Sequence, residues 1–212
     1  MNSSFQIASV IAALGLGVTI GEYRSAQPQP VAPIAQDGAQ EGQIPAEMMA
    51  EMEAWFRAGT PGEHHKYMDH FAGEWDAEVT LFFGPGVSET SKGTMKNEWV
   101  LDGRFLVGQY DGSAMGQPFS GMSVMGYDNA AQTYRGLWID SMSTHFQQSA
   151  GYCSEDGKTF SMKTTTTNAE TGEPMPGKEE MVIESADRHR MTAWYEEGGE
   201  MVKSMEIVYT RK

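Results

Sequence analysis

The residues best suited to metal or acid–base chemistry are the histidines near the middle of the N-terminal half. His64, His65 and His70 lie close together in the sequence, a grouping that could indicate a metal site. Adjacent histidines point in different directions, however, and no carboxylate-rich pattern completes a tetrahedral ligand set. We therefore interpret these three as capping or surface residues and expect no metal site.

A second candidate, for nucleophilic catalysis, is the run Asp140 to His145, which contains Ser141 and Ser143. A serine nucleophile needs a base within hydrogen-bond reach. On a strand, Ser141, Ser143 and His145 would share one face, while Asp140 would point to the other. The run therefore resembles a catalytic triad in sequence only. Asp111 and Asp140 could both reach a lumen, but no spacing argues for paired-carboxylate chemistry.

His145 also raises the question of haem, because a single histidine can serve as an axial iron ligand in a small barrel. On a strand it would be opposite in parity to the apolar Phe146 and would face away from the interior. We therefore expect no cofactor. The single Cys153 cannot form an intramolecular disulfide or a thiolate metal cluster, and we expect it to be a small apolar filler.

Strands must position these residues, because the dominant sequence period from residue 73 onward is two. Apolar and polar residues alternate from Trp75 to Phe83 and again near the C-terminus, as in half-buried strands. Turn sequences rich in Gly, Asp and Asn separate about ten such segments. Short connections predict an all-β, up-and-down antiparallel arrangement. Closure into a barrel would remove the exposed edges, and an open sandwich is the alternative.

The two ends of this region favour the barrel. Gly73-Glu74-Trp75 opens the first strand, and Arg211 lies in the last one. In lipocalin-like barrels a Gly-x-Trp packs its indole at the barrel floor, and an Arg or Lys of the last strand lies over that indole. Trp75 and Arg211 both fall on the apolar faces of their strands. We therefore expect these two side chains to be in contact.

Further stretches carry a recognisable pattern. They are Pro61-Gly62 with His65, Met68 and Phe71; Leu101 with Gly103-Arg104-Phe105-Leu106; Met115-Gly116 with Pro118-Phe119; Gly126-Tyr127-Asp128-Asn129; Trp138-Ile139-Asp140-Ser141-Met142; and Met205-Glu206-Ile207-Val208-Tyr209-Thr210-Arg211. Together they resemble a bacterial family known as domain of unknown function 1579, a relative of the calycin (lipocalin-like) barrels. The resemblance covers residues 61–212 and departs from the family pattern at Asp102, where a Gly is usual. It implies a fold without implying an activity.

Within these motifs, Arg104, Tyr127, Trp138 and Asp140 are larger or more polar than a sealed core requires. We predict that they line a ligand-binding site. A buried Arg104 or Asp140 would need a partner, and we expect the two to pair with each other, as a structural clasp or as the polar end of the site.

Two compositional features bear on whether a barrel would be hollow. Fifteen of the sixteen Met follow residue 45, which suits either an adaptable apolar cavity or an ordinary core. Glycine weakens strand pairing, so glycines inside strands can serve to leave space or to bend the sheet. Those within the predicted strands are Gly108, Gly121, Gly126, Gly136 and Gly151.

The N-terminal part divides into three segments before the barrel. An apolar run at residues 7–20 is too short for a comfortable membrane span, so residues 1–25 are predicted to be a secretory signal, with an uncleaved anchor as the alternative. Residues 26–44 read as a Pro/Gln-rich linker. Residues 45–60 are predicted to form an amphipathic helix. Its apolar face, which we expect to pack on the barrel or to cover an opening, consists of Met48, Met52, Trp55 and Phe56.

The formal net charge of −14 would repel a phosphate backbone or an anionic lipid surface, so we expect neither nucleic acid nor peripheral membrane binding. Three functions stay open. The first is an exported, non-enzymatic barrel that binds a small apolar ligand. The second is a small-barrel enzyme, an isomerase or hydrolase that uses Asp140, Tyr127 and Arg104. The third is a protein-interaction module whose helix engages a partner.

Overall fold

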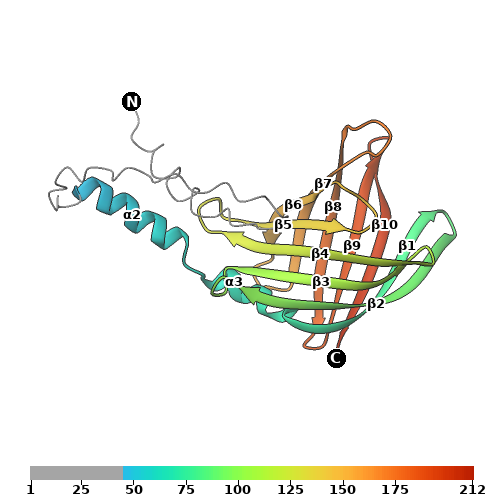
Figure 1. Cartoon of the computed structure of the whole chain (residues 1–212), viewed down its shortest axis with the longest axis horizontal. Helices are drawn as coiled ribbons and strands as arrows, with labels where there is room; N and C mark the ends of the chain where they lie inside the picture. The colour runs from blue at the N-terminus through green and yellow to red at the C-terminus, as the bar shows by residue number, and fades with distance from the viewer. Residues whose placement is uncertain (1–44) are drawn as a thin grey trace, which may run out of the picture. The chain divides into compact units, whose positions relative to one another are not determined.

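The computed structural model describes residues 45–212, in which three short helical segments precede ten strands (Figure 1). The predicted signal segment and linker lie outside the described residues. The helical segments are α2 (Ala46–Ala58), α3 (Glu63–Tyr67) and the 3-10 helix η1 (Met68–Phe71). The strands are β1 (Gly73–Gly84), β2 (Val87–Val100), β3 (Phe105–Ala114), β4 (Gln117–Asp128), β5 (Thr133–Asp140), β6 (Gln147–Cys153), β7 (Thr159–Thr167), β8 (Pro174–Ser185), β9 (Arg188–Glu197) and β10 (Glu200–Arg211).

The ten strands form one closed antiparallel barrel in which each strand pairs with its neighbours in the sequence. The first and last strands complete the ring, in a register that runs from Trp75 opposite Arg211 to Leu81 opposite Met205. The predicted all-β, up-and-down barrel is therefore confirmed, and the open sandwich is excluded. Successive strands run in opposite directions, so every second turn lies at the same end of the barrel.

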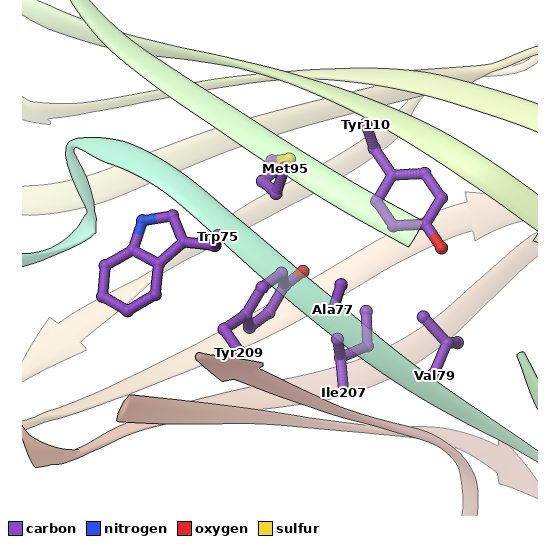
Figure 2. Close-up of a cluster of buried hydrophobic side chains, with 7 residues drawn as sticks. All are labelled: Trp75, Ala77, Val79, Met95, Tyr110, Ile207 and Tyr209. Atoms are coloured by element: carbon purple, nitrogen blue, oxygen red, sulfur yellow. The ribbon is translucent and has the colours of Figure 1, made fainter. Parts of the chain in front are cut away.

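The interior is built by the period-two alternation of the strands. In β1 the buried residues Trp75, Ala77 and Val79 alternate with exposed polar ones. They pack against Ile207 and Tyr209 of β10, and Figure 2 shows these side chains gathered on one side of the sheet together with two more residues from β2 and β3. Burial of this inward face supplies the main stabilisation of the barrel.

One end of the barrel, the floor, is closed by η1 and by the contact between Trp75 and Arg211. The Trp75 indole is fully buried, and its Nε1 donates a hydrogen bond to the Phe71 carbonyl oxygen at 2.8 Å. The Arg211 guanidinium carbon lies 4.0 Å from the centre of the Trp75 ring. Its two terminal nitrogens donate to the carbonyl oxygens of Ala72 and His70, at 2.9 and 2.7 Å. Arg211 therefore covers the indole and satisfies backbone acceptors of η1 and the residue after it.

The predicted packing of the N-terminal helix is wrong. No residue of α2 is buried, and Trp55 and Phe56 are 59% and 58% exposed. The segments that cover the floor are α3 and η1, where Met68 is fully buried. The end of α2 is attached through Asn129, whose side chain donates to the Ala58 carbonyl oxygen at 2.8 Å. None of the helices in the described part of the chain is long and apolar enough to cross a membrane.

Candidate functional site

A cavity of about 490 Å³ occupies the barrel interior above the floor. This volume lies in the range of pockets that enclose a small molecule. Most of its lining is apolar or aromatic, and the principal apolar residues are Val79, Leu81, Met95, Leu106, Phe119, Met125, Leu137, Trp138, Met162, Met181, Met191, Met205 and Ile207. Six of the thirteen are methionines, so part of the methionine set lines a cavity. Flexible thioether side chains suit a guest of irregular shape.

Strand glycines make room for large side chains on the inward face. Gly121 of β4 lies opposite Asp140, and a Cβ atom at Gly121 would overlap the Trp138 ring. A Cβ atom at Gly136 would similarly overlap the Ser149 hydroxyl of the neighbouring strand. The space left by these glycines is therefore occupied by neighbouring side chains, which bring an indole and a hydroxyl to the cavity wall.

The Asp140 carboxylate holds the end of β5 together. One oxygen accepts a hydrogen bond from Trp138 Nε1 at 3.1 Å. The other accepts from the backbone N–H groups of Met142 and Ser143, at 2.9 and 3.0 Å. Asp140 thus orients the indole and starts the turn after β5. Both Trp138 and Asp140 line the cavity.

The predicted pair between Arg104 and Asp140 is wrong. Arg104 donates to the Leu101 carbonyl oxygen at 3.0 Å and lies 3.7 Å from the Asp102 carboxylate. It comes just before β3, at the floor, whereas Asp140 ends β5 at the opposite end of the barrel. Arg104 and Tyr127 instead line a second recess, of about 480 Å³. The four predicted ligand-binding residues are therefore divided between two ends of the barrel.

His145 lies at the mouth of the cavity, which is not where the sequence predicts it. The segment between β5 and β6 is a loop, because the Asp140 turn ends the strand, so strand parity does not apply there. His145 and Ser143 both line the cavity. The Ser141 hydroxyl accepts a hydrogen bond from the Ser120 backbone N–H at 3.1 Å.

Glu179 also lines the cavity and is not among the site residues predicted from the sequence. It lies on β8, between Met162 of β7 and Ala193 of β9 in the strand register. Burial raises the pKa of its carboxyl, and the nearby Ser149 hydroxyl opposes that shift. The sequence contains a signal for this position, because Glu179 has the same strand parity as the apolar Met181 and therefore faces the same side of the strand.

His189 forms part of the cavity bottom. It is buried, and its ring stacks on Tyr209 with the ring centres 4.5 Å apart. Burial lowers its pKa to about 3, with smaller contributions from His70 and Arg211, so the imidazole is neutral near pH 7. Its Nδ1 is buried without a hydrogen-bond partner among the described residues.

The histidine cluster divides by depth. His65 is buried, and its Nδ1 accepts a hydrogen bond from the Gly62 backbone N–H at 3.1 Å, which caps α3. His64 is exposed and stacks on Tyr127 with ring centres 4.1 Å apart. His70 faces inward beside His189. Within residues 45–212, no three His, Cys, Asp or Glu side chains are grouped as metal ligands.

The comparisons with known proteins agree with this architecture. The sequence model of the family described as "Protein of unknown function (DUF1579)" matches residues 60–211. The chain belongs to this family. No curated protein matches it. The solved structures that resemble it include Rv2717c from M. tuberculosis, with a TM-score of 0.56, 11% identity, and coverage of 72% of this chain and 99% of that one. The S-type phycobiliprotein lyase CPES from Guillardia theta has a TM-score of 0.49 and 11% identity over 72% of this chain and 94% of that one.

In this DUF1579 protein the residues considered for catalysis do not converge on one site. The three residues expected to serve an isomerase or hydrolase, Asp140, Tyr127 and Arg104, lie at opposite ends of the barrel. Asp140 is engaged by the indole and by the backbone of its own turn. Within the part of the chain that the structure describes, no serine or cysteine is hydrogen-bonded to a histidine side chain as an activated nucleophile would be.

Proposed function

We propose that this protein is an exported barrel that binds one small, mostly apolar molecule in its lumen. The observation that carries the proposal is the cavity of about 490 Å³ lined mainly by Met, Leu and aromatic side chains. A barrel that served only as a scaffold would be stabilised by filling this space, because each apolar void forfeits packing energy. An open apolar lumen is instead the usual form of a small-molecule site.

A protein-interaction role for α2 is the second candidate. It is favoured by the exposure of Trp55 and Phe56, two large aromatic side chains on one short helix. Ligand binding comes first because the interior is hollow, and a side-chain-filled lumen is what the interaction role alone would predict. Because the cavity lining is mostly apolar, the ligand in the first proposed function is expected to be mostly apolar as well.

The test is a titration of the purified protein with an apolar fluorescent probe. We expect one site with a dissociation constant in about the micromolar range, and quenching of tryptophan emission because Trp138 is on the cavity wall. Trp138→Ala should weaken binding by about tenfold, equivalent to about 1.4 kcal/mol. Circular dichroism should show unchanged strand content.

Trp194→Ala is the matched control. Trp194 lies on β9 with the parity opposite to that of the cavity residues, and Lys178 Nζ lies 4.3 Å from its ring centre. This variant should bind the probe as the wild type does. Competition with a neutral isoprenoid alcohol should displace the probe. Binding that appears only in partly unfolded protein would contradict the proposal and favour the interaction role.

A further inference from the structure

We infer that the lumen selects ligands carrying a basic amine, and that Glu179 is the residue that selects them. This inference rests on the proposed ligand binding and gives the chemical class of the ligand's polar end.

The charges of the cavity lining are one-sided. No Lys or Arg is among its lining residues, whereas two carboxyl groups, those of Asp140 and Glu179, are. A ligand with an anionic headgroup would find no cation there and would bring a third acid into a low-dielectric space. The formal net charge of −14 acts in the same direction at longer range.

The two carboxyl groups differ in their partners: Glu179 has the nearby Ser149 hydroxyl and no cation beside it among the described lining residues. Asp140 already accepts hydrogen bonds from Trp138 Nε1 and from two backbone N–H groups. Glu179 takes part in none of the ion pairs found in residues 45–212. Its cross-strand neighbours, Met162 and Ala193, are apolar. A carboxyl group enclosed without a cation is unfavourable, and this cost is relieved when a cation binds beside it.

An amine fits whichever protonation state Glu179 holds in the empty barrel. A protonated amine meets the carboxylate as an ion pair, and a neutral amine accepts the proton of a neutral carboxyl group, so the two routes reach the same pair. Burial raises the pKa of the Glu179 carboxyl, which makes the second route accessible. Tyr209 lines the same cavity, so its aromatic ring is available to a bound amine; burial raises the pKa of its phenol, and the nearby Tyr110 and Glu179 raise it further.

The experiment compares three ligands with one alkyl chain, dodecylamine, dodecanol and dodecanoate, as competitors of the apolar probe on the protein purified from its own organism. Measurements are made below micelle-forming concentrations and at physiological salt, which screens attraction to the outer surface. The wild type should bind the amine at least about tenfold more tightly than the alcohol, and the carboxylate most weakly of the three.

Glu179→Gln should bring the ratio of amine to alcohol affinity close to one while it leaves the affinity for the alcohol nearly unchanged. Glu180→Gln is the matched control, since this neighbour has the opposite strand parity and does not line the cavity. It should keep the wild-type ratio. Should Glu179→Gln not fold, Glu179→Met tests the same loss of charge with a side chain already common in the lumen.

The outcomes separate the two proposals. Equal affinity for amine and alcohol in the wild type, or a preference for the amine that survives the removal of Glu179, would overturn the inference and leave ligand binding intact. Failure of all three ligands and of the probe to bind any variant would overturn both. A preference lost in Glu179→Gln and kept in Glu180→Gln supports the inference.

Discussion

Two titratable side chains of the lumen, His189 and Glu179, respond to burial in opposite directions. Burial lowers the pKa of His189 to about 3 and raises the pKa of Glu179, because in each case the charged form loses its hydration. Both groups therefore favour neutrality inside the barrel. At the scale of single residues, the enclosure of these side chains decides the polarity that a ligand in the lumen would meet.

His189 should make the barrel sensitive to acid. Above pH 6.5 it is neutral in the folded and unfolded states and has no effect. As the pH falls from 6.5 towards 3, the unfolded chain binds a proton that the folded protein does not, so stability falls across this window. At pH 4.5, about two units below the unfolded pKa, the loss is about 3 kcal/mol.

The check is to measure the free energy of unfolding in urea at pH 7 and pH 4.5 for the wild type and for His189→Gln. The pH-dependent loss should be smaller in the variant by about 3 kcal/mol. Glu179 changes stability in the opposite sense, because its pKa is raised in the folded state and the fold is therefore more stable at lower pH. Both proteins contain Glu179, so its contribution cancels when their losses are compared. An identical loss in both proteins would show that folding does not lower the pKa of His189.

At the scale of elements, the barrel is completed by the pairing of β1 with β10, and the contact between Trp75 and Arg211 lies at the floor end of that pair. Because Arg211 packs on the indole and donates to two backbone carbonyls, Arg211→Ala should lower the free energy of unfolding by roughly 1–3 kcal/mol. A double-mutant cycle with Trp75→Phe should show coupling between the two positions.

Lys212→Ala is the control for this prediction, since Lys212 Nζ lies 3.7 Å from the Asp76 carboxylate at the surface. Exposed ion pairs contribute little, so this variant should change stability by less than about 1 kcal/mol. Additive effects of the Arg211 and Trp75 substitutions would mean that each side chain stabilises the floor independently. The indole would then not depend on the guanidinium that covers it.

At the scale of the whole molecule, the proposed export has the widest consequence, because it would decide which small molecules the barrel could meet. The apolar run at residues 7–20, followed by a Pro/Gln-rich segment, motivates the proposal. N-terminal sequencing of the protein purified from its own organism should begin between about residues 20 and 30. A mature protein that retains Met1 would contradict cleavage and leave the anchored alternative.

The sequence by itself determined the class and connectivity of the fold. Alternation with period two, turn sequences between the segments, and Trp75 and Arg211 at the two ends were sufficient for a closed up-and-down barrel of about ten strands. These signals are local, or they depend only on which strands are first and last. They can therefore be recognised without knowledge of how the side chains pack.

The tertiary structure alone decided which polar residues meet. Parity assigns a strand residue to a face but not to a height along the barrel axis. On parity alone, Arg104 and Asp140 were predicted to pair. In the structure Arg104 is at the floor and Asp140 is near the mouth. Strand parity did not apply to His145, because the Asp140 side chain accepts the backbone hydrogen bonds of a turn and β5 ends there. The place of the Glu179 carboxyl beside the cavity could not be predicted, because ten strands must close into a ring before their side chains share one cavity.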